Sequence, residues 1–213
     1  KAGQDSETEV TSLLNQGMKG LILDLRYNGG GLVTQAVEVS SKFIPSGAVM
    51  HVQGRDGQKK TLYTVGRRIT DVPMVVLVNE YTASASEIVS GALQDTKVAT
   101  VIGVPTFGKG LVQTLFPLSD GSGLAVTTQI YLTAGGREIT PNSPIKPDVE
   151  VQALTPEELE KIKNEQAKRG GPTGPVTAED LLRIDPALDP QLRRALEILK
   201  DQIESSKTRR NAA

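Results

Sequence analysis

Two stretches of the chain repeat one pattern of hydrophobic and polar positions. Each opens on a short apolar run, at Gly20–Leu25 and at Met74–Val78, and passes through a loop into a segment whose apolar residues recur every three or four positions. A short continuous apolar run is typical of a buried strand, and the second spacing is typical of an amphipathic helix. Strand, loop and helix in this order, found twice, predict an α/β fold. The helix-spaced residues are Val33, Ala36, Val37, Ser40 and Phe43 in the first segment and Ile88, Val89, Ala92 and Leu93 in the second.

Segments between and beyond these two units predict further strands. Ala48–Gln53 and Lys59–Val65 flank a turn with two glycines and indicate a β-hairpin. Strands are also expected near Val98–Ile102, Leu111–Phe116 and Leu124–Leu132, with glycine-rich turns after the last two. These strands complete the body of the chain, in which no fixed-period repeat is present.

The chain changes character after Val151, where helical patterns replace the strands. Thr155–Glu158 has the sequence of a capping box with proline at the first helical position, so a helix is expected to begin there. A second helix opens at Asp189–Pro190, and Ser205–Ala213 is expected to fray. Between the two helices, Arg169–Pro175 predicts a flexible break. The second helix has an apolar stripe formed by Leu192, Ala195, Leu196, Leu199 and Ile203.

This change divides the chain into two parts. Residues 1–152 form the α/β body, and residues 153–213 form a helical extension that packs either on the body or on a second copy of the chain. The chain opens at Lys1 without a methionine or an apolar segment of the signal-peptide type, so we expect a fragment or a processed form.

Composition and charge exclude several classes of function. The 24 basic and 25 acidic residues nearly cancel, and aromatic residues are 3% of the chain, whereas a nucleic-acid binder needs a basic surplus and stacking aromatics. Without cysteine there is no disulfide scaffold, thiol nucleophile or Cys/His zinc site, and a Ser-His-Asp triad would depend entirely on His51. The longest apolar run, Met74–Val78, is far shorter than the roughly 18 residues of a membrane span.

The loop Asn79–Glu87, which joins the second buried strand to its helix, holds the first candidate for chemistry. Ser84 would lie there on a sharp turn, beside the free amides and the positive dipole end of the helix, and this suits a nucleophile. The run Ser84–Glu87 is also a helix capping box, and serine is among the commonest N-cap residues. The local sequence leaves both interpretations open.

The segment Gly103–Gly110 holds the second candidate and nearly matches a phosphate-binding loop. Gly110 stands where that motif needs a hydroxyl, and a strand follows where the motif needs a helix, so nucleotide binding is rejected. If Lys109 is desolvated, it can act as a neutral base, which requires a pKa about 3 units below its usual value. A surface lysine in a glycine turn is the alternative.

The glycine run that closes the first strand is the third candidate. In Arg26–Gly31, successive glycines would allow backbone N–H groups to point into a cleft, as in an oxyanion hole. Three glycines also suit an ordinary tight turn, and the motif in isolation favours that interpretation.

In their order and spacing, the three loops resemble the signature of the carboxyl-terminal processing (tail-specific) peptidases. The matching runs are LDLRYNGGG at 23–31, VNEYTASASEI at 78–88 and TFGKGLVQ at 106–113, with further matches at Gly91–Asp95 and Ile145–Val149. The resemblance covers roughly residues 7–150. It implies a crotonase- and Clp-protease-like superhelix of strand–strand–helix units, and no metal or organic cofactor.

The resemblance also implies roles for individual residues. The family cleaves peptide bonds with a Ser–Lys dyad, which falls here on Ser84 and on Lys109, 25 positions later. A glutamine four residues beyond the lysine, here Gln113, holds the lysine by a hydrogen bond in the family.

The family's oxyanion hole uses two backbone amides. One follows the nucleophile and corresponds to Ala85, and the other comes from a glycine of the first loop, which we place at Gly31 with Gly30 as the alternative. His51 lies outside all three motifs and is interpreted as structural.

The expected function is therefore that of a serine endopeptidase that cleaves protein substrates with unstructured C-terminal tails. The family's location implies an extracytoplasmic protein, in the periplasm, the cell envelope or the thylakoid lumen. The family normally carries an upstream PDZ domain that captures the tail. Neither that domain nor the strand expected before Asp5–Gln16 is in this sequence, so the body is expected to be N-terminally incomplete.

Two other functions remain open. One is a latent protease fragment that serves as an assembly module and forms a homodimer through its C-terminal helices. The other is a crotonase-like enzyme acting on acyl-CoA thioesters, which would share the glycine amides of an oxyanion hole but gives no reason for Lys109 at its spacing.

A few positions depart from the family pattern. Gly29 stands where the family usually has proline, which would loosen the oxyanion loop, and Thr82 replaces a common serine but keeps the hydroxyl. Thr133–Gly136 lacks a usual Thr-Pro pair and Pro144 replaces a glycine, and both changes are expected to be local.

Overall fold

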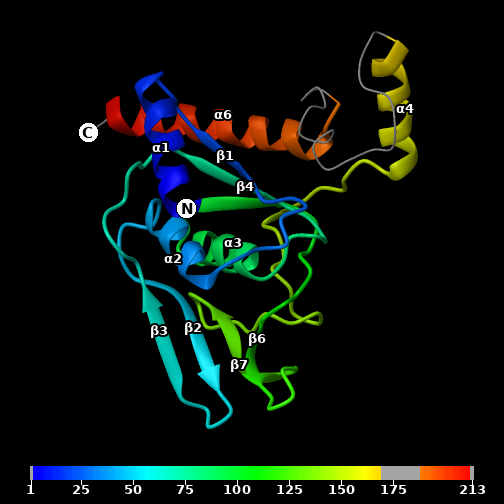
Figure 1. Cartoon of the computed structure of the whole chain (residues 1–213). Helices are drawn as coiled ribbons and strands as arrows, with labels where there is room; N and C mark the ends of the chain where they lie inside the picture. The colour runs from blue at the N-terminus through cyan, green and yellow to red at the C-terminus, as the bar shows by residue number, and fades with distance from the viewer. Residues whose placement is uncertain (1, 169–187, 212–213) are drawn as a thin grey trace.

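The elements of the chain stack in four layers (Figure 1). In order, these are the helix α6 (Pro190–Asn211), a parallel sheet, a layer of helices and an antiparallel sheet. The computed structural model describes residues 2–168 and 188–211. Two sheets with helices between them confirm the predicted α/β class.

The parallel sheet contains both of the buried strands predicted from the sequence. Its order is β1-β4-β5-β8, and β1 pairs with β4 in a register that places Leu21 beside Met74. All five residues of β4 are buried, so this sheet is covered on both faces, by α3 on one side and α6 on the other. The strands are β1 (Leu21–Asp24), β4 (Met74–Val78), β5 (Ala99–Gly103) and the two-residue β8 (Val149–Glu150), which the sequence pattern did not predict.

The helical layer is centred on α3 (Ala85–Asp95), which contacts both sheets. All its residues except Asp95 are buried. The helix α2 (Val33–Ser41) packs against α3, and α1 (Ala2–Asn15) packs against α2. The main core cluster lies between these helices and the two sheets.

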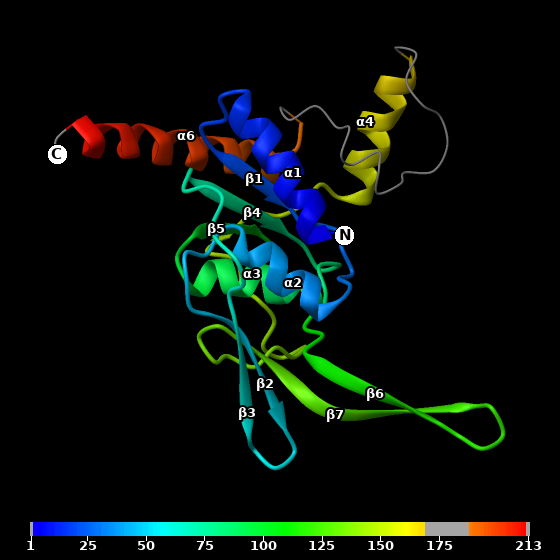
Figure 2. The same ribbon diagram turned by 60° about the vertical axis from the view of Figure 1, so that its left-hand side comes forward.

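The antiparallel sheet has the order β3-β2-β7-β6. The predicted hairpin is confirmed as β2 (Ala48–Gly54) and β3 (Lys59–Tyr63), and β7 (Gly123–Thr133) joins it to the edge strand β6 (Leu111–Pro117). The β6–β7 hairpin extends away from the body, as Figure 2 shows.

Two helices follow the body. At α4 (Pro156–Lys168) the predicted capping box is formed, with Thr155 Oγ1 accepting from Glu158 N at 3.2 Å and Glu158 Oε2 accepting from Thr155 N at 2.8 Å. The predicted fraying of Ser205–Ala213 is wrong as far as Asn211, where α6 ends, and residues 212–213 lie outside the described part of the chain. Hydroxyl groups in this last part bond back to the preceding turn, with Thr208 Oγ1 donating to Glu204 O at 3.1 Å. The predicted break at 169–175 lies outside the described residues.

The apolar stripe of α6 covers the outer face of the parallel sheet. Ala195 and Leu199 are buried against Val75, Leu77 and Ile102 in a second core cluster. Of the predicted stripe, Leu196 is exposed. The helix α6 thus packs on the body, and a homodimer through the C-terminal helices stays a prediction. No helix in the two described ranges combines the length and the apolar character that spanning a membrane requires.

Candidate active site

All three candidate loops leave the same edge of the parallel sheet. Because β1, β4 and β5 are parallel neighbours, the segments that follow them, residues 25–32, 79–84 and 104–110, start from adjacent carboxyl ends (Figure 1). In open α/β sheets, ligands bind at this edge. The topology therefore gathers motifs that lie far apart in the sequence.

Ser84 occupies the turn between β4 and α3 in a backbone conformation that is unusual for a residue with a side chain. Its φ is 55° and its ψ is −119°, and the residue is half-buried. Such a conformation costs about 1–3 kcal/mol and persists where the surrounding structure imposes it. A strained strand-to-helix turn is the arrangement that presents the nucleophile in α/β-hydrolases.

The capping box predicted for the same residues is also present. Ser84 N donates to Glu87 Oε2 at 2.8 Å, which is the half of the capping box that the carboxylate supplies. Ser84 directly precedes the first residue of α3. The two interpretations that the sequence left open are therefore compatible with each other.

Glu87 is the buried centre of the site. The residue is 0% exposed, yet its carboxylate accepts four hydrogen bonds. Oε2 accepts from Ser84 N and from Lys109 N, both at 2.8 Å. Oε1 accepts from Thr106 Oγ1 at 2.5 Å and from Gly108 N at 2.7 Å. The single atom Oε2 thus fixes the loop that holds Ser84 relative to the loop that holds Lys109. The four donors compensate for the burial of the carboxylate.

Hydrogen bonds also connect the glycine loop, residues 25–32, to the loop that holds Ser84, residues 79–84. Thr82 is fully buried, and its hydroxyl donates to Leu25 O at 2.8 Å, so the hydroxyl that the sequence keeps at this position is used. Asn28 O accepts from Ala83 N at 3.1 Å, and Asn28 Oδ1 accepts from Ser86 Oγ at 2.9 Å. These bonds hold the two loops edge to edge.

Gly30 lies directly against Ser84. A Cβ at this position would be 2.6 Å from Ala83 O, 2.7 Å from Ala85 N and 3.0 Å from Ser84 Cβ. Its own N–H donates to Asn28 Oδ1 at 3.0 Å. Gly30 therefore allows the close approach of the loop, while its amide is already used inside the loop.

The amides of Gly31 and Ala85 are in a different situation. Within residues 2–168 and 188–211, neither N–H has a hydrogen-bond acceptor. Both residues line one cavity of about 270 Å³. Two unpaired amides at the wall of one cavity are what an oxyanion requires.

Replacing Gly30 by alanine is expected to destabilise the fold by at least about 2 kcal/mol, because φ is +94° and the new methyl group would meet backbone atoms. Gly29→Ala is the matched control, since a Cβ there meets nothing within 4 Å and its φ is not positive. Urea unfolding of both variants measures the difference. Equal midpoints for the two variants would contradict the close approach at Gly30.

The side chains of Lys109 and Gln113 lie in the exposed segment that leads into and forms the start of β6. Within the described parts of the chain, no hydrogen bond joins the Lys109 side chain to Ser84 or to Gln113. Glu87 holds the backbones of Ser84 and Lys109 together, but the ammonium group is not desolvated. The Ser–Lys dyad therefore stays a prediction.

The cavity beside Gly31 and Ala85 is mainly apolar. Residues Ala2 and Ser6 of α1 contribute to its lining, and Asp24 and Asn28 supply polar groups. A cavity of this size and lining suits a single small or medium-sized apolar side chain of a ligand. Its aliphatic lining consists of Leu23, Leu25, Leu32, Ala36, Val39 and Val89.

Two stacked tyrosines connect the glycine loop, which holds Tyr27, with the loop at residues 79–84, which holds Tyr81. The ring centroids of Tyr27 and Tyr81 are 5.4 Å apart, and Tyr81 is 57% exposed. Burial raises the pKa of Tyr27 above its ordinary value, and the charge of Glu80 adds to this rise, so the phenol is neutral at pH 7. The stack is a side-chain contact between the loop that follows β1 and the loop that follows β4.

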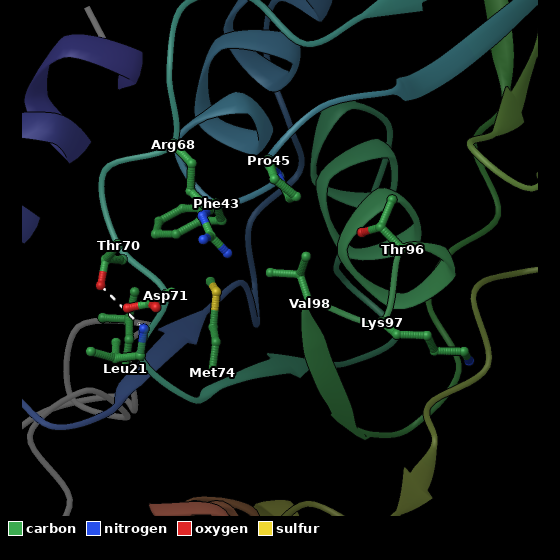
Figure 3. Close-up of a pocket in the computed structure, with 11 residues that line it drawn as sticks. Leu21, Phe43, Pro45, Arg68, Thr70, Asp71, Met74, Thr96, Lys97 and Val98 are labelled. Atoms are coloured by element: carbon green, nitrogen blue, oxygen red, sulfur yellow. Dashed lines mark hydrogen bonds between the residues drawn. The ribbon is translucent and has the colours of Figure 1, made fainter. Parts of the chain in front are cut away.

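A second cavity of about 270 Å³ lies at the opposite edge of the parallel sheet (Figure 3). It is lined by Leu21 and Met74, where β1 and β4 begin, and by Phe43, Arg68 and Lys97. None of the site residues predicted from the sequence lines it. The candidate chemistry thus belongs to the carboxyl edge.

His51 has the structural role expected from the sequence. It lies on β2, where its Nδ1 is 2.8 Å from Thr61 Oγ1 and its Nε2 is 3.1 Å from Ala134 O. Both ring nitrogens are therefore engaged in contacts within and beside the antiparallel sheet.

Comparison with known proteins identifies the family. The sequence pattern of Peptidase family S41 matches residues 1–151, which include all three loops. The chain belongs to Peptidase family S41. The members of this family are serine peptidases, so the resemblance seen in the three motifs is confirmed.

Relatives of this S41 chain are carboxyl-terminal processing proteases. It is 47% identical over 127 residues to the carboxyl-terminal-processing protease of Synechocystis sp., which covers 60% of this chain and 30% of that protein. It is 42% identical over 159 residues to the chloroplastic C-terminal processing peptidase of Tetradesmus obliquus, with coverages of 74% and 34%.

A solved structure supports the same S41 fold. The photosystem II D1 C-terminal processing protease superposes with a TM-score of 0.68 at 41% identity, covering 71% of this chain and 39% of that one. This chain therefore spans less than half the length of each of these three proteins.

Sequence reasoning missed how several polar residues are used in the S41 site. From the sequence, Glu87 was assigned only to the fourth position of a capping box. Nothing in the local pattern indicated its bonds to Gly108 and Lys109. Asn28 and Thr106 lie within two of the quoted motifs, but no role was assigned to them, because their partners are remote in sequence. An acidic residue inside an otherwise apolar helical stretch was the available hint.

Proposed function

We propose that this chain carries the catalytic body of a serine endopeptidase that trims the C-terminal tails of protein substrates, with Ser84 as nucleophile and Lys109 as base. The observation that supports this most strongly is the strained turn at Ser84, whose amide shares one carboxylate oxygen with the amide of Lys109. Strain of this kind at a strand–helix turn is expected where a side chain must be presented to a substrate.

The proposed reaction needs no group beyond this chain and water. The neutral amine of Lys109 removes the proton of Ser84 Oγ, and Oγ attacks the carbonyl carbon of the scissile peptide bond. The amides of Gly31 and Ala85 bind the resulting oxyanion. The lysinium then gives its proton to the leaving amine, the C–N bond breaks, and an acyl ester remains on Ser84. Lys109 next deprotonates a water molecule, whose oxygen attacks the ester carbonyl; as the ester C–O bond breaks, the lysinium returns the proton to Ser84 Oγ and the amine is neutral again.

The base requires a neutral Lys109, and the exposed position of this residue indicates what must change on binding. A peptide lying over residues 104–113 would cover the amine and remove part of its hydration, which lowers the pKa of a lysine. Gln113, four residues beyond on β6, is proposed to orient the amine once the peptide is in place.

The substrate is proposed to be an unstructured C-terminal segment with a small or medium-sized apolar residue beside the cleaved bond. The aliphatic cavity next to Gly31 and Ala85 supports this preference. An upstream PDZ domain and an extracytoplasmic location, as in the family, complete the proposal, and the chloroplastic relative agrees with that location.

Lys109 provides the test of the proposed function. A reporter protein with a disordered C-terminal tail is incubated with the protein, and mass spectrometry identifies the truncated product. Lys109→Ala is expected to lower the cleavage rate by at least about a hundredfold, which is the usual contribution of general-base catalysis. Lys109→Arg is expected to lose as much, because a guanidinium keeps its charge but cannot accept the serine proton.

Lys60→Ala is the matched control, since it removes an exposed lysine on β3. This variant is expected to cleave at the wild-type rate. Full activity in Lys109→Ala or in Lys109→Arg would contradict the role of the lysine as base. The absence of any truncated product with the wild-type protein would contradict the proposed function itself.

A further inference from the structure

A buried ionic network lies directly behind the glycine loop. Arg26, two residues before Asn28, has a side chain that is only 10% exposed. Its Nε and Nη2 donate to the carboxylate of Asp24 at 3.0, 3.1 and 2.8 Å, and its backbone N donates to Asp24 Oδ1 at 3.0 Å. This bidentate pair leaves Nη1 to reach another element.

Nη1 of Arg26 donates to the first turn of α6. It contacts Asp189 Oδ2 at 2.7 Å and Gln191 Oε1 at 3.1 Å. Asp189 is 5% exposed and Gln191 is 0% exposed, so this contact is closed to solvent. The partners of Arg26 thus come from positions 163 and 165 residues further along the chain.

The same two residues fix the start of α6. Asp189 Oδ1 accepts from Gln191 N and from Leu192 N, both at 3.0 Å, and thereby caps the helix. Gln191 Nε2 donates to Val151 O at 2.8 Å, in the segment that leaves β8. The first turn of α6 is therefore attached to the sheet at two points beside the carboxyl edge.

The charges of this cluster are balanced by the helix. Two carboxylates face one guanidinium, and the partial positive charge at the N-terminus of α6 lies beside Asp189 and offsets the second negative charge. Burial by itself lowers the pKa of Arg26, but its hydrogen bond and charge interaction with Asp24, together with Asp189, raise the pKa above its ordinary value. The guanidinium is thus a permanent cation, and the cluster is complete only when α6 is docked.

We propose that Asp189 and Gln191 are positioning residues for the oxyanion loop, so that the docked first turn of α6 is a working part of the active site. Arg26 links the end of β1 to this turn, and Tyr27, Asn28 and the three glycines follow it directly. Fixing the guanidinium fixes the direction in which the chain leaves the sheet, and hence the place of the Gly31 amide. The family pattern ends at residue 151, so these positioning residues come from outside it. This inference rests on the function proposed above.

Asp189→Asn is the central variant of the test. It keeps the side-chain volume, and with its oxygen still capping the helix it places an amide NH₂ donor against the guanidinium. The expected result is a fall of at least about tenfold in kcat with KM changed less than about twofold, because a misplaced amide weakens the transition state rather than substrate binding. Active molecules are counted by covalent labelling of Ser84 with a fluorophosphonate, so that loss of folded protein does not enter kcat.

Asp201→Asn is the matched control, since it makes the same change on an exposed position of the same helix. A second variant, Gln191→Met, removes one partner of Arg26 and keeps the ion pair, and it is expected to lower kcat by about threefold or more. Binding of a peptide aldehyde, which forms a tetrahedral adduct on the serine, is expected to weaken in parallel with kcat, while binding of the cleaved product peptide does not.

The outcomes separate the two proposals. If the wild-type protein neither cleaves peptides nor binds the aldehyde, the proposed function fails. If the wild type does both, and Asp189→Asn and Gln191→Met show the kcat and aldehyde affinity of Asp201→Asn, the positioning role of α6 is contradicted. Lower thermal stability with unchanged kcat per labelled serine also contradicts it, since that is the result of a purely structural contact.

Discussion

Replacing Ser84 by alanine is expected to reduce peptide cleavage to the background of the assay. Loss of the nucleophile costs up to about a millionfold in kcat in a serine peptidase, so this is the largest single effect expected in the chain. The variant should fold like the wild type, because alanine is as strained as serine at φ 55° and keeps the position of Cβ. Mass spectrometry of the reporter measures cleavage, and covalent labelling with the fluorophosphonate should be lost.

Ser84→Gly separates catalysis from strain. It removes the same hydroxyl, but glycine adopts the backbone conformation of this turn without steric cost. Part of the 1–3 kcal/mol of strain is therefore relieved, and this variant is expected to unfold at a higher urea concentration than Ser84→Ala. Ser46→Ala, in an exposed turn, is the control for both variants and should cleave normally. Cleavage by Ser84→Ala above background would remove Ser84 from the proposed mechanism.

Replacing Glu87 by glutamine is expected to damage stability and activity together. Glutamine keeps the shape but has only one acceptor oxygen, so an NH₂ group must face either the amides of Ser84 and Lys109 or the donors Thr106 and Gly108. Each buried donor left without an acceptor costs about 1–3 kcal/mol, which makes a loss of about 2–6 kcal/mol in the free energy of unfolding.

The activity of Glu87→Gln is expected to fall at least about a hundredfold even below its unfolding temperature, because the nucleophile loop and the lysine loop lose their common acceptor. Glu9→Gln, which makes the same change at an exposed position of α1, is the control. Urea unfolding and the reporter assay measure the two effects. Wild-type stability in Glu87→Gln would show that the four bonds to the carboxylate do not hold the loops.

Much of the body was predictable because its elements carry their own signals. The run Met74–Val78 is apolar throughout since β4 is covered on both faces, and the turn between β2 and β3 contains two glycines. The three loops were also predictable as a set, because their order and spacing resemble one family signature, whereas their meeting at one edge of a parallel sheet is known from the structure. The residue at which α6 ends was not predictable, since hydroxyl groups in its last turns bond to the helix itself.

Other features depend on contacts that no local pattern records. The sequence placed the oxyanion amide at Gly31 with Gly30 as the alternative, but the approach of Gly30 to Ala83 and Ala85 and the bond of its amide to Asn28 could not be predicted from it. A glycine-flanked lysine in an apolar stretch suggested a desolvated base, but the strand that follows is an edge strand of a projecting hairpin, so Lys109 is exposed. A strand in the middle of a sheet would have buried it.

The burial of α3 between two sheets has a consequence for how this site can move. Because ten of its eleven residues are inaccessible, α3 cannot shift without opening the core of the molecule, and its amides share the global stability of the fold. Ser84, at the start of this helix, is therefore the fixed reference point of the site. Lys109, by contrast, lies in an exposed segment outside this helix, so we expect a bound peptide to displace the lysine side chain more easily than the backbone of Ser84.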